Sequence, residues 1–343
     1  MTPERFEQIS ARYPRLRVAV VGDFCLDRYL EIDPAKAEIS IETGLPVHNV
    51  VRVRSQPGAA GTILNNLEAL GVGAILPVGF CGEDGEGYEL LRALGRRRGV
   101  RLDFFTQTDQ RRTFTYCKPL LLHPGRPPEE LNRLDSKNWS PTPPSVQEQL
   151  MAALRAVAEQ VDAIIFMDQV DVAETGVVTA RMLGEVADLA KRRPELLMLG
   201  DSRRGLRGWP PISLKMNAAE LAAHTGAHEI LSVEQVRAEA ASLARASGRH
   251  VFVTLAERGL VGAAASVEPL HEPALPLRGL IDVVGAGDAV TANLTVALAA
   301  GASVEESLKI AAAAASVVIH QLGTTGTATP RQVAECRALQ EQQ

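Results

Sequence analysis

Short apolar runs alternate with longer amphipathic stretches along most of this chain. Because the runs are short and rich in valine, isoleucine and leucine, they predict strands buried on both faces. These strands are expected at residues 17–23, 73–79, 162–168, 195–201 and 250–259. Helical periodicity lies between them, at residues 60–70, 84–98, 145–160, 173–193, 218–224 and 233–247. This alternation predicts an α/β fold with a doubly wound, mostly parallel sheet flanked by helices.

Two segments break the alternation. Residues 29–53 and 112–122 have strand-like patterns with no helix to connect them to a parallel sheet. We therefore expect them to pair into a small separate β-sheet that acts as a lid over a binding site. The remaining pattern gives no sign of a second core, so we expect one domain over residues 1–343.

A glycine-rich turn precedes a long apolar helix pattern near the C-terminus. Gly285, Ala286, Gly287 and Asp288 stand at this junction. The first N–H groups of a helix have no partner within it, and small residues let an anion approach them closely. An aspartate at that position can accept the proton of a hydroxyl that attacks phosphorus. A simple helix cap explains Asp288 equally well from these four residues alone.

A second junction combines an amide and a carboxylate. Asn217 and Glu220 are three residues apart at the expected start of a helix, so they lie on one face. Together they can hold a hydrated Mg²⁺ beside nucleotide phosphates. A capping box accounts for the same spacing.

The last long helix pattern, residues 303–323, is apolar almost all round and rich in alanine. It predicts a buried helix that begins with Ser303 and Glu306 in capping-box spacing. The alanines can serve core packing alone, or they can also let a flat base approach closely.

Composition narrows the class of protein. The chain is 46% hydrophobic and 22% charged, and it lacks the roughly 18 uncharged apolar residues in a row that a membrane span needs. Its net charge of −5 disfavours nucleic acid and anionic membranes as partners. The four cysteines match no metal or redox spacing, and the N-terminus has no signal-peptide pattern, so we expect a cytoplasmic protein with reduced thiols.

The motifs "DVVGAGD", "NAAE" and "VTLAERG" resemble those of the ribokinase-like (PfkB) family of carbohydrate kinases in order and separation. On the N-terminal side, "VVGDFCLDRYL", "PGAAGTILNNLEALG" and "ELNRLDSKN" are most similar to the branch that includes the bacterial heptose-7-phosphate kinases. The resemblance covers almost the whole chain, so we expect these 343 residues to lack the nucleotidyltransferase domain that some of those kinases carry.

The resemblance implies an ATP-dependent kinase that uses Mg²⁺ and transfers the γ-phosphate to a hydroxyl of a sugar or sugar phosphate. Asp288 would be the catalytic base, and the amides of Gly285, Ala286 and Gly287 would form an anion hole. The nucleotide and metal would be held by Asn217, Glu220, Thr254, Gly259 and Asp282. The sugar would be bound by Asp27, Gly58, Ala59, Thr62 and Asp168.

Several positions depart from the family pattern. Ala256 stands where relatives commonly have glycine, and Val284 and Ala289 replace threonines beside the glycine turn. Because an anion hole is made of backbone donors, we expect catalysis to survive these changes. Thr62 replaces an asparagine on the sugar side, which leaves the identity of the sugar open.

A phosphorylated, heptose-7-phosphate-like sugar is the favoured substrate, because Lys118 and Arg133 lie in or beside the expected lid and can meet a substrate phosphate. Surface charges without a function are the alternative for both residues. The lid is also a candidate surface for homodimer formation. A nucleoside kinase of the same fold and a catalytically inactive sugar- or nucleotide-binding protein are the competing functions.

Overall fold

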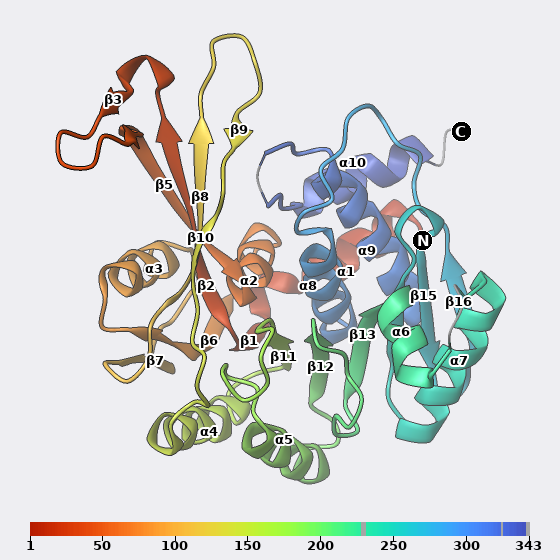
Figure 1. Ribbon diagram of the computed structural model, residues 1–343. Coiled ribbons are helices and arrows are strands. Elements are labelled where there is room, and N and C mark those ends of the chain that lie inside the picture. The colour runs from red at the N-terminus through yellow and green to blue at the C-terminus, as the bar shows by residue number, and fades with distance from the viewer. Residues whose placement is uncertain (228–230, 324, 341–343) are drawn as a thin grey trace.

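The computed structural model describes residues 1–227, 231–323 and 325–340, and its core is a nine-stranded sheet, which can be followed in Figure 1. The strand order is β16-β15-β14-β13-β12-β11-β1-β6-β7, and all neighbours from β14 to β7 are parallel. The strands are β1 (Arg17–Gly22), β6 (Ala74–Gly82), β7 (Phe105–Thr108), β11 (Ala163–Asp168), β12 (Leu197–Ser202), β13 (Ser213–Asn217), β14 (Val251–Thr254), β15 (Leu260–Ala264) and β16 (Val267–Glu272). The doubly wound parallel sheet is therefore confirmed, with an antiparallel edge at β15 and β16.

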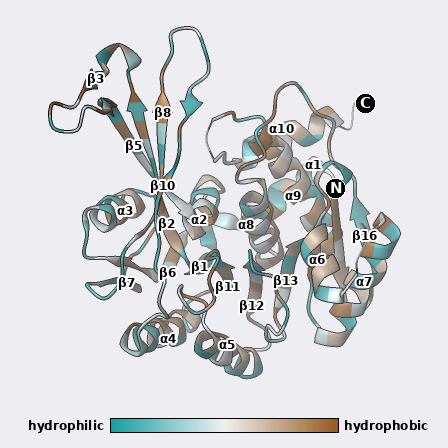
Figure 2. Cartoon of the chain, in the orientation of Figure 1, coloured by the Kyte–Doolittle hydropathy of each residue, from teal (hydrophilic) through white to brown (hydrophobic). Residues whose placement is uncertain are grey.

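Helices cover both faces of this sheet and form two separate hydrophobic cores. On one face lie α1 (Pro3–Ser10), α2 (Ala60–Ala69), α3 (Gly85–Gly95), α8 (Ala286–Ala299), α9 (Val304–Ile319) and α10 (Pro330–Gln340). On the other lie α4 (Pro144–Ala158), α5 (Ala180–Arg192), α6 (Ala218–Thr225) and α7 (Val233–Ser247). Figure 2 shows hydrophilic and hydrophobic positions side by side on the outer helices α5 and α7, as expected for helices with one buried face.

The sequence placed the start of α5 too early. The expected helix begins at residue 173, whereas α5 begins at Ala180 after the N-cap Thr179. The intervening loop is held by Asp23, whose carboxylate accepts hydrogen bonds from the amides of Gln169, Val170 and Val177. A buried carboxylate that needs donors thus keeps this backbone out of a helix.

A second, smaller sheet stands apart from the first and projects beyond it (Figure 1). Its order is β10-β8-β2-β5, from β2 (Phe24–Ile32), β5 (Val50–Ala59), β8 (Phe114–Leu121) and β10 (Leu134–Ser136), and β9 (Glu129–Glu130) pairs with β8. A short pair, β3 (Glu38–Ile39) and β4 (Pro46–Val47), lies between β2 and β5. The sheet uses both segments that lacked crossover helices, and it extends further, to Phe24, Ala59 and Ser136. Its action as a lid remains a prediction.

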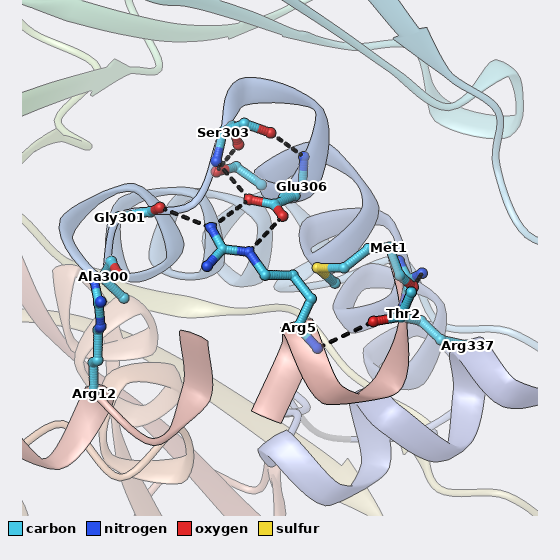
Figure 3. Close-up of polar contacts among 10 residues, drawn as sticks. Met1, Thr2, Arg5, Arg12, Ala300, Gly301, Ser303, Glu306 and Arg337 are labelled. Carbon is cyan, nitrogen blue, oxygen red and sulfur yellow. Dashed lines mark hydrogen bonds and ion pairs between the residues drawn. The ribbon is translucent and has the colours of Figure 1, made fainter. Parts of the chain in front are cut away.

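The N-terminal helix is tied to the turn between α8 and α9 (Figure 3). The Arg5 guanidinium lies 2.7 Å from Oε1 of Glu306 and donates to the carbonyl of Gly301 at 3.1 Å. Arg12 donates to the carbonyl of Ala300 at 2.9 Å. These bonds satisfy carbonyls that the C-terminus of α8 leaves without helical partners. They fix the far end of the helix whose first turn carries Asp288.

Among the elements that the hydrophobic pattern did not anticipate are two strands, β7 and β16, and two helices, α1 and α10. The two strands are short or half-exposed edges, and the two helices are mostly polar, so none produces a strong periodic signal. Within the described part of the chain, no helix has both the length and the apolar character needed to cross a membrane.

Candidate active site

The glycine-rich turn forms an uncapped helix start. Gly285 is the N-cap of α8 with a left-handed φ of 83°, and among the described residues no side chain caps the first turn. The amide of Ala286, expected in the anion hole, instead donates to the carbonyl of Val283 at 3.2 Å, so Gly287 and Asp288 carry the amides that remain for an anion. The body of the helix is buried from Ala289 to Ala297 and therefore holds this end in place. Free amides on a fixed backbone, together with the helix dipole, suit an anion.

Asp288 follows these amides and separates two cavities. One cavity, of about 260 Å³, is lined by Gly285 and Asp288. The other, of about 700 Å³, is lined by Ala286 and Gly287. The first turn of α8 is thus a shared wall, and a group bound in one cavity can meet a group bound in the other across it.

The smaller cavity lies between the second sheet and the carboxyl ends of the central strands. It is lined by three of the residues expected to bind the sugar, Asp27, Ala59 and Thr62. Gly58 is not among its lining residues, but a Cβ there would lie 2.5 Å from Oδ2 of Asp27. Glycine at this position therefore makes room for the Asp27 carboxylate.

Asp27 is buried and faces a cation. Its Oδ1 lies 3.6 Å from Nζ of Lys118, which also lies over the ring of Tyr29. Burial raises the pKa of Asp27 above its usual value, while the charge of Lys118 acts in the opposite direction. Lys118 therefore pairs with Asp27, and both residues line the smaller cavity.

Asp168 lies elsewhere. Its side chain is buried, accepts hydrogen bonds from Ser202 at 2.7 Å and Arg204 at 2.8 Å, and does not line the smaller cavity. Two neighbours in the following loop, Gln169 and Asp171, line it instead. The expected sugar contact of Asp168 therefore stays a prediction, and the loop that it begins supplies the exposed polar groups.

Four cations surround the smaller cavity, of which the sequence suggested Lys118 and Arg133. Lys137 and Arg203 complete the set, and both pair with Asp171, at 2.7 and 3.6 Å. Arg133 pairs with Asp135 at 3.1 Å. Arg133 and Lys137 also lie over the ring of Tyr116. Lys137 and Arg203 come from separate loops, so no spacing in the sequence links them.

The larger cavity gathers most of the residues expected at the nucleotide. Asn217, Thr254 and Gly259 line it, and small residues of α9 form part of its wall. Gly259 has a φ of 95°, and a Cβ there would lie 2.1 Å from the carbonyl oxygen of Glu272, so only glycine fits. Ala256 has a φ of 53° in the same turn, at the position where relatives commonly have glycine.

Asp282 does not line either cavity. Its Oδ1 accepts the amide of Val284 at 3.0 Å, and its Oδ2 accepts the amide of Gly323 at 3.2 Å. It therefore joins the glycine turn to the loop that follows α9. A positioning role accounts for these bonds, and its expected contact with the nucleotide stays a prediction.

Asn217 and Glu220 form a reciprocal capping box at the start of α6. The amide of Glu220 donates to Oδ1 of Asn217 at 2.9 Å, and the amide of Asn217 donates to Oε2 of Glu220 at 2.8 Å. Burial raises the pKa of Glu220, and the bond from the Asn217 amide opposes that shift. The expected capping box is thus present in the structure. It holds both side chains at the junction between β13 and α6, beside the larger cavity.

A buried charge cluster lies beside Asp288. Burial raises the pKa of Asp288 to about 7, the carboxylate of Asp201 adds to the shift, and Lys215 opposes it. Lys215 is buried with its Nζ 2.9 Å from Oδ2 of Asp201, and a Cβ on Gly287 would lie 3.2 Å from that Nζ. No sequence pattern points to Lys215, because a single lysine in an apolar strand has no motif around it.

Comparison with known proteins extends these findings. Residues 211–331 match the model of the pfkB family carbohydrate kinases. The bifunctional protein HldE of Pelobacter propionicus (strain DSM 2379 / NBRC 103807 / OttBd1) is 31% identical over 342 residues, which cover 97% of this chain and 66% of that protein. HldE of Bradyrhizobium sp. (strain ORS 278) is 30% identical over 320 residues, which cover 93% of this chain and 63% of that protein. The chain thus spans slightly less than two thirds of these relatives.

Solved structures agree in fold. Arabidopsis thaliana ribokinase, complexed with ribose and ATP, superposes with a TM-score of 0.66 at 21% identity, over 94% of this chain and 98% of that chain. Phosphofructokinase-2 from Escherichia coli, in complex with fructose-6-phosphate, gives a TM-score of 0.67 at 15% identity, over 94% and 99%. The fold is ribokinase-like, and residues 211–331 of the chain match the pfkB family of carbohydrate kinases.

Proposed function

We propose that this protein is an ATP-dependent kinase that phosphorylates a hydroxyl of a sugar or sugar phosphate. One observation carries the proposal: two cavities meet at the uncapped start of α8, with Asp288 on the side of the smaller one. The larger, mainly apolar cavity suits a nucleotide, and the smaller, charged cavity suits a polyhydroxylated acceptor.

The arrangement supports an in-line transfer. Asp288 takes the proton of the acceptor hydroxyl as its oxygen attacks the γ-phosphorus. The bond from the γ-phosphorus to the bridging oxygen breaks, and that electron pair leaves with ADP. The amides of the first turn of α8 stabilise the charge on the transferred group. A pKa near 7 leaves Asp288 able both to accept a proton and to release it.

The donor set at the nucleotide side fits Mg²⁺. Kinases commonly hold this ion by one or two carboxylates together with substrate phosphates and water. Glu220 uses one carboxylate oxygen, Oε2, in the capping box, and Asn217 is exposed at the cavity. Glu220 and Asn217 would hold the ion or its water ligands, and the ion would neutralise charge on the phosphates.

A phosphorylated sugar of the heptose-7-phosphate type is the substrate that we favour. The bifunctional HldE relatives support this choice, and so do the four cations around the smaller cavity. Each cation already has a carboxylate or aromatic partner, so a substrate phosphate would bind to preorganised side chains.

A nucleoside kinase of the same fold is the second candidate. The charged lining of the smaller cavity disfavours it, because a nucleoside acceptor presents an apolar base that needs apolar or aromatic walls. A binding protein without turnover is the third candidate. It is disfavoured by the presence of Asp288 beside free helix amides, since binding alone does not need a base at that point.

The decisive experiment measures ATP consumption with a panel of free hexoses, heptoses, their terminal phosphates and nucleosides. We expect turnover with sugar phosphates, and we expect Asp288→Asn to lower kcat by at least about 100-fold while ADP binding is retained. Turnover with nucleosides alone would establish the second candidate. Nucleotide binding without turnover of any acceptor would establish the third.

We also propose that two copies associate through the second sheet, in a cytoplasmic enzyme supplied with ATP. Strand β5 is the free edge of that sheet and exposes Val50, Val51 and Val53. An exposed apolar edge strand is a ready partner for another strand. Sedimentation should show a dimer in the wild type and a monomer in Val51→Lys. A monomeric wild type would overturn this assembly.

A further inference from the structure

Ser316 is a buried polar residue without a partner in the wall of the larger cavity. Its side chain is 5% exposed, and its Oγ is buried and makes no hydrogen bond. Among the described residues that line this cavity, it alone has a buried side-chain polar atom in that state. A buried hydroxyl without a partner costs folding free energy, so its presence calls for a ligand atom or another function.

Other hydroxyls on α8 and α9 form hydrogen bonds within their own helices. Ser307 donates to the carbonyl of Ser303 at 2.8 Å, and Thr295 donates to that of Thr291 at 2.9 Å. Each uses the carbonyl four residues earlier, which is the usual partner of a serine or threonine within a helix. Ser316 has the same opportunity at Ala312 and does not take it.

The helix face around Ser316 is suited to a flat ring. Ala312, Ala315, Ser316 and Ile319 all line the larger cavity, and their spacing of three, four and seven residues places them on one face of α9. Two methyl groups and one aliphatic side chain give an apolar surface, and the hydroxyl is the single polar group within it. Such a surface accepts the face of a base and presents one hydrogen-bonding group to its edge.

We propose that Ser316 recognises the nucleobase of the phosphoryl donor, by a hydrogen bond from or to a polar atom on the edge of a purine. The proposal rests on the proposed function, since it names the group that selects the donor of that reaction. The hydroxyl would turn toward the base by rotation about χ1 from one staggered position to another. Phosphate binding at α8 and base recognition at α9 are then separate contributions to donor affinity.

The test is calorimetric binding of ADP, purine riboside diphosphate, 7-deaza-ADP and inorganic pyrophosphate to the wild type and to Ser316→Ala. One net hydrogen bond corresponds to a loss of about 2- to 10-fold in affinity, and we expect that loss for ADP. We expect the loss to vanish for the analogue that lacks the contacted atom, and pyrophosphate to bind both proteins equally. Ser307→Ala, on the same helix with its hydroxyl bonded to Ser303, is the matched control and should bind all four ligands as the wild type does.

Two results would overturn the inference. The first is unchanged ADP affinity in Ser316→Ala, which would mean that the hydroxyl serves only the helix or an internal water. The second is an equal loss for ADP and pyrophosphate, which would mean a general disturbance of the site. Failure of the wild type to bind any nucleotide would overturn the proposed function as well, whereas sugar phosphorylation with an indifferent Ser316 would overturn the inference alone.

Discussion

Nζ of Lys215 lies 2.9 Å from Oδ2 of Asp201, in a buried ion pair beside the first turn of α8. The same carboxylate oxygen accepts a hydrogen bond from Oγ1 of Thr291 at 2.8 Å, so the pair is attached to the helix that carries Asp288. Burial by itself lowers the pKa of Lys215, but Asp201 and the neighbouring Asp288 raise it above its usual value. The ion pair therefore fixes the Lys215 ammonium beside the first turn of α8, with its charge balanced by Asp201.

Removal of the Lys215 charge should destabilise the folded protein. Lys215→Met leaves the Asp201 carboxylate buried without its cation, and we expect the free energy of unfolding to fall by about 3 kcal/mol or more in urea denaturation. The double variant Lys215→Met with Asp201→Asn removes both charges and should recover a substantial part of that loss, because the amide can still bond to Thr291. Equal stability of the two variants would show that the pair is not coupled.

The raised pKa of Asp288 predicts the pH dependence of the reaction. A base must be ionised, so kcat/KM should fall as the pH drops below about 7, with a slope of one proton. A conventional aspartate would lose activity only near pH 4. The pH profile of kcat/KM for the acceptor measures this midpoint in the free enzyme. A profile that is flat from pH 8 to pH 5 would assign the base to another group.

The same shift makes a prediction about stability. The folded state disfavours the ionised form of Asp288, so the wild type gains stability as the pH falls through about 7 towards the unfolded-state value. Asp288→Asn has no such penalty. Its Tm should exceed that of the wild type at pH 8, and the difference should shrink at pH 5. A lower Tm at pH 8 would mean that the carboxylate is stabilised by its surroundings.

The sequence predicts the layered fold well because long periodic elements dominate it. The helix expected at residues 233–247 coincides with α7, whose capping box at Ser232 and C-terminal Gly248 mark both ends. The pattern fails where a tertiary contact decides the local structure. The Asp23 carboxylate captures three amides of the loop before α5, and no local signal announces a partner about 150 residues away.

The candidate site divides in the same way. Motif residues such as Asp288, Asn217 and Gly259 lie at the cavities because the turns that carry them are short and local. Lys215, Lys137 and Arg203 reach the site through tertiary packing, so only the structure reveals them. Asp168 shows the opposite limit. Its position at the end of a strand was predicted correctly, but Ser202 and Arg204 bind its carboxylate, and it does not line the smaller cavity.

Replacement of Ala256 by glycine should stabilise the folded protein. Its φ of 53° is unfavourable for an alanine, and the residue is exposed, so its methyl group contributes little packing. Ala256→Gly removes the strain but adds backbone freedom to the unfolded chain, and we expect a net gain of about 0.5 kcal/mol in unfolding free energy. Glu257→Gly, in the same turn but at a residue without a positive φ, is the control and should destabilise. A clear loss in Ala256→Gly would show that the methyl group packs against a partner.

Glu220 allows the metal and capping roles to be separated. Glutamine can still accept the amide of Asn217, so Glu220→Gln should leave thermal stability nearly unchanged. As a neutral ligand it binds a hard cation more weakly, so we expect a higher Mg²⁺ concentration for half-maximal rate. Glu220→Ala should lose both functions, with a lower Tm and a raised Mg²⁺ requirement. An unchanged Mg²⁺ dependence in both variants would leave Glu220 with the helix cap alone.

Arg133 and Lys118 should respond differently when each is replaced by alanine. Arg133 pairs with Asp135 and is 42% exposed, so its removal leaves no buried charge without a partner. We expect Arg133→Ala to lower kcat/KM for sugar phosphates by about 10-fold or more while free sugars are used as before, because a lost cation is felt only by the substrate phosphate. Lysine at position 133 should restore part of the preference.

Lys118→Ala instead leaves the buried Asp27 without its cation 3.6 Å away. Because Asp27 faces the acceptor cavity whether or not the substrate carries a phosphate, kcat/KM should fall for free and phosphorylated sugars alike. The double variant Lys118→Ala with Asp27→Asn restores neutrality and tests whether the loss comes from the uncompensated carboxylate. If Arg133→Ala also reduces both classes equally, the cations serve the architecture of the cavity, and the substrate does not need a phosphate.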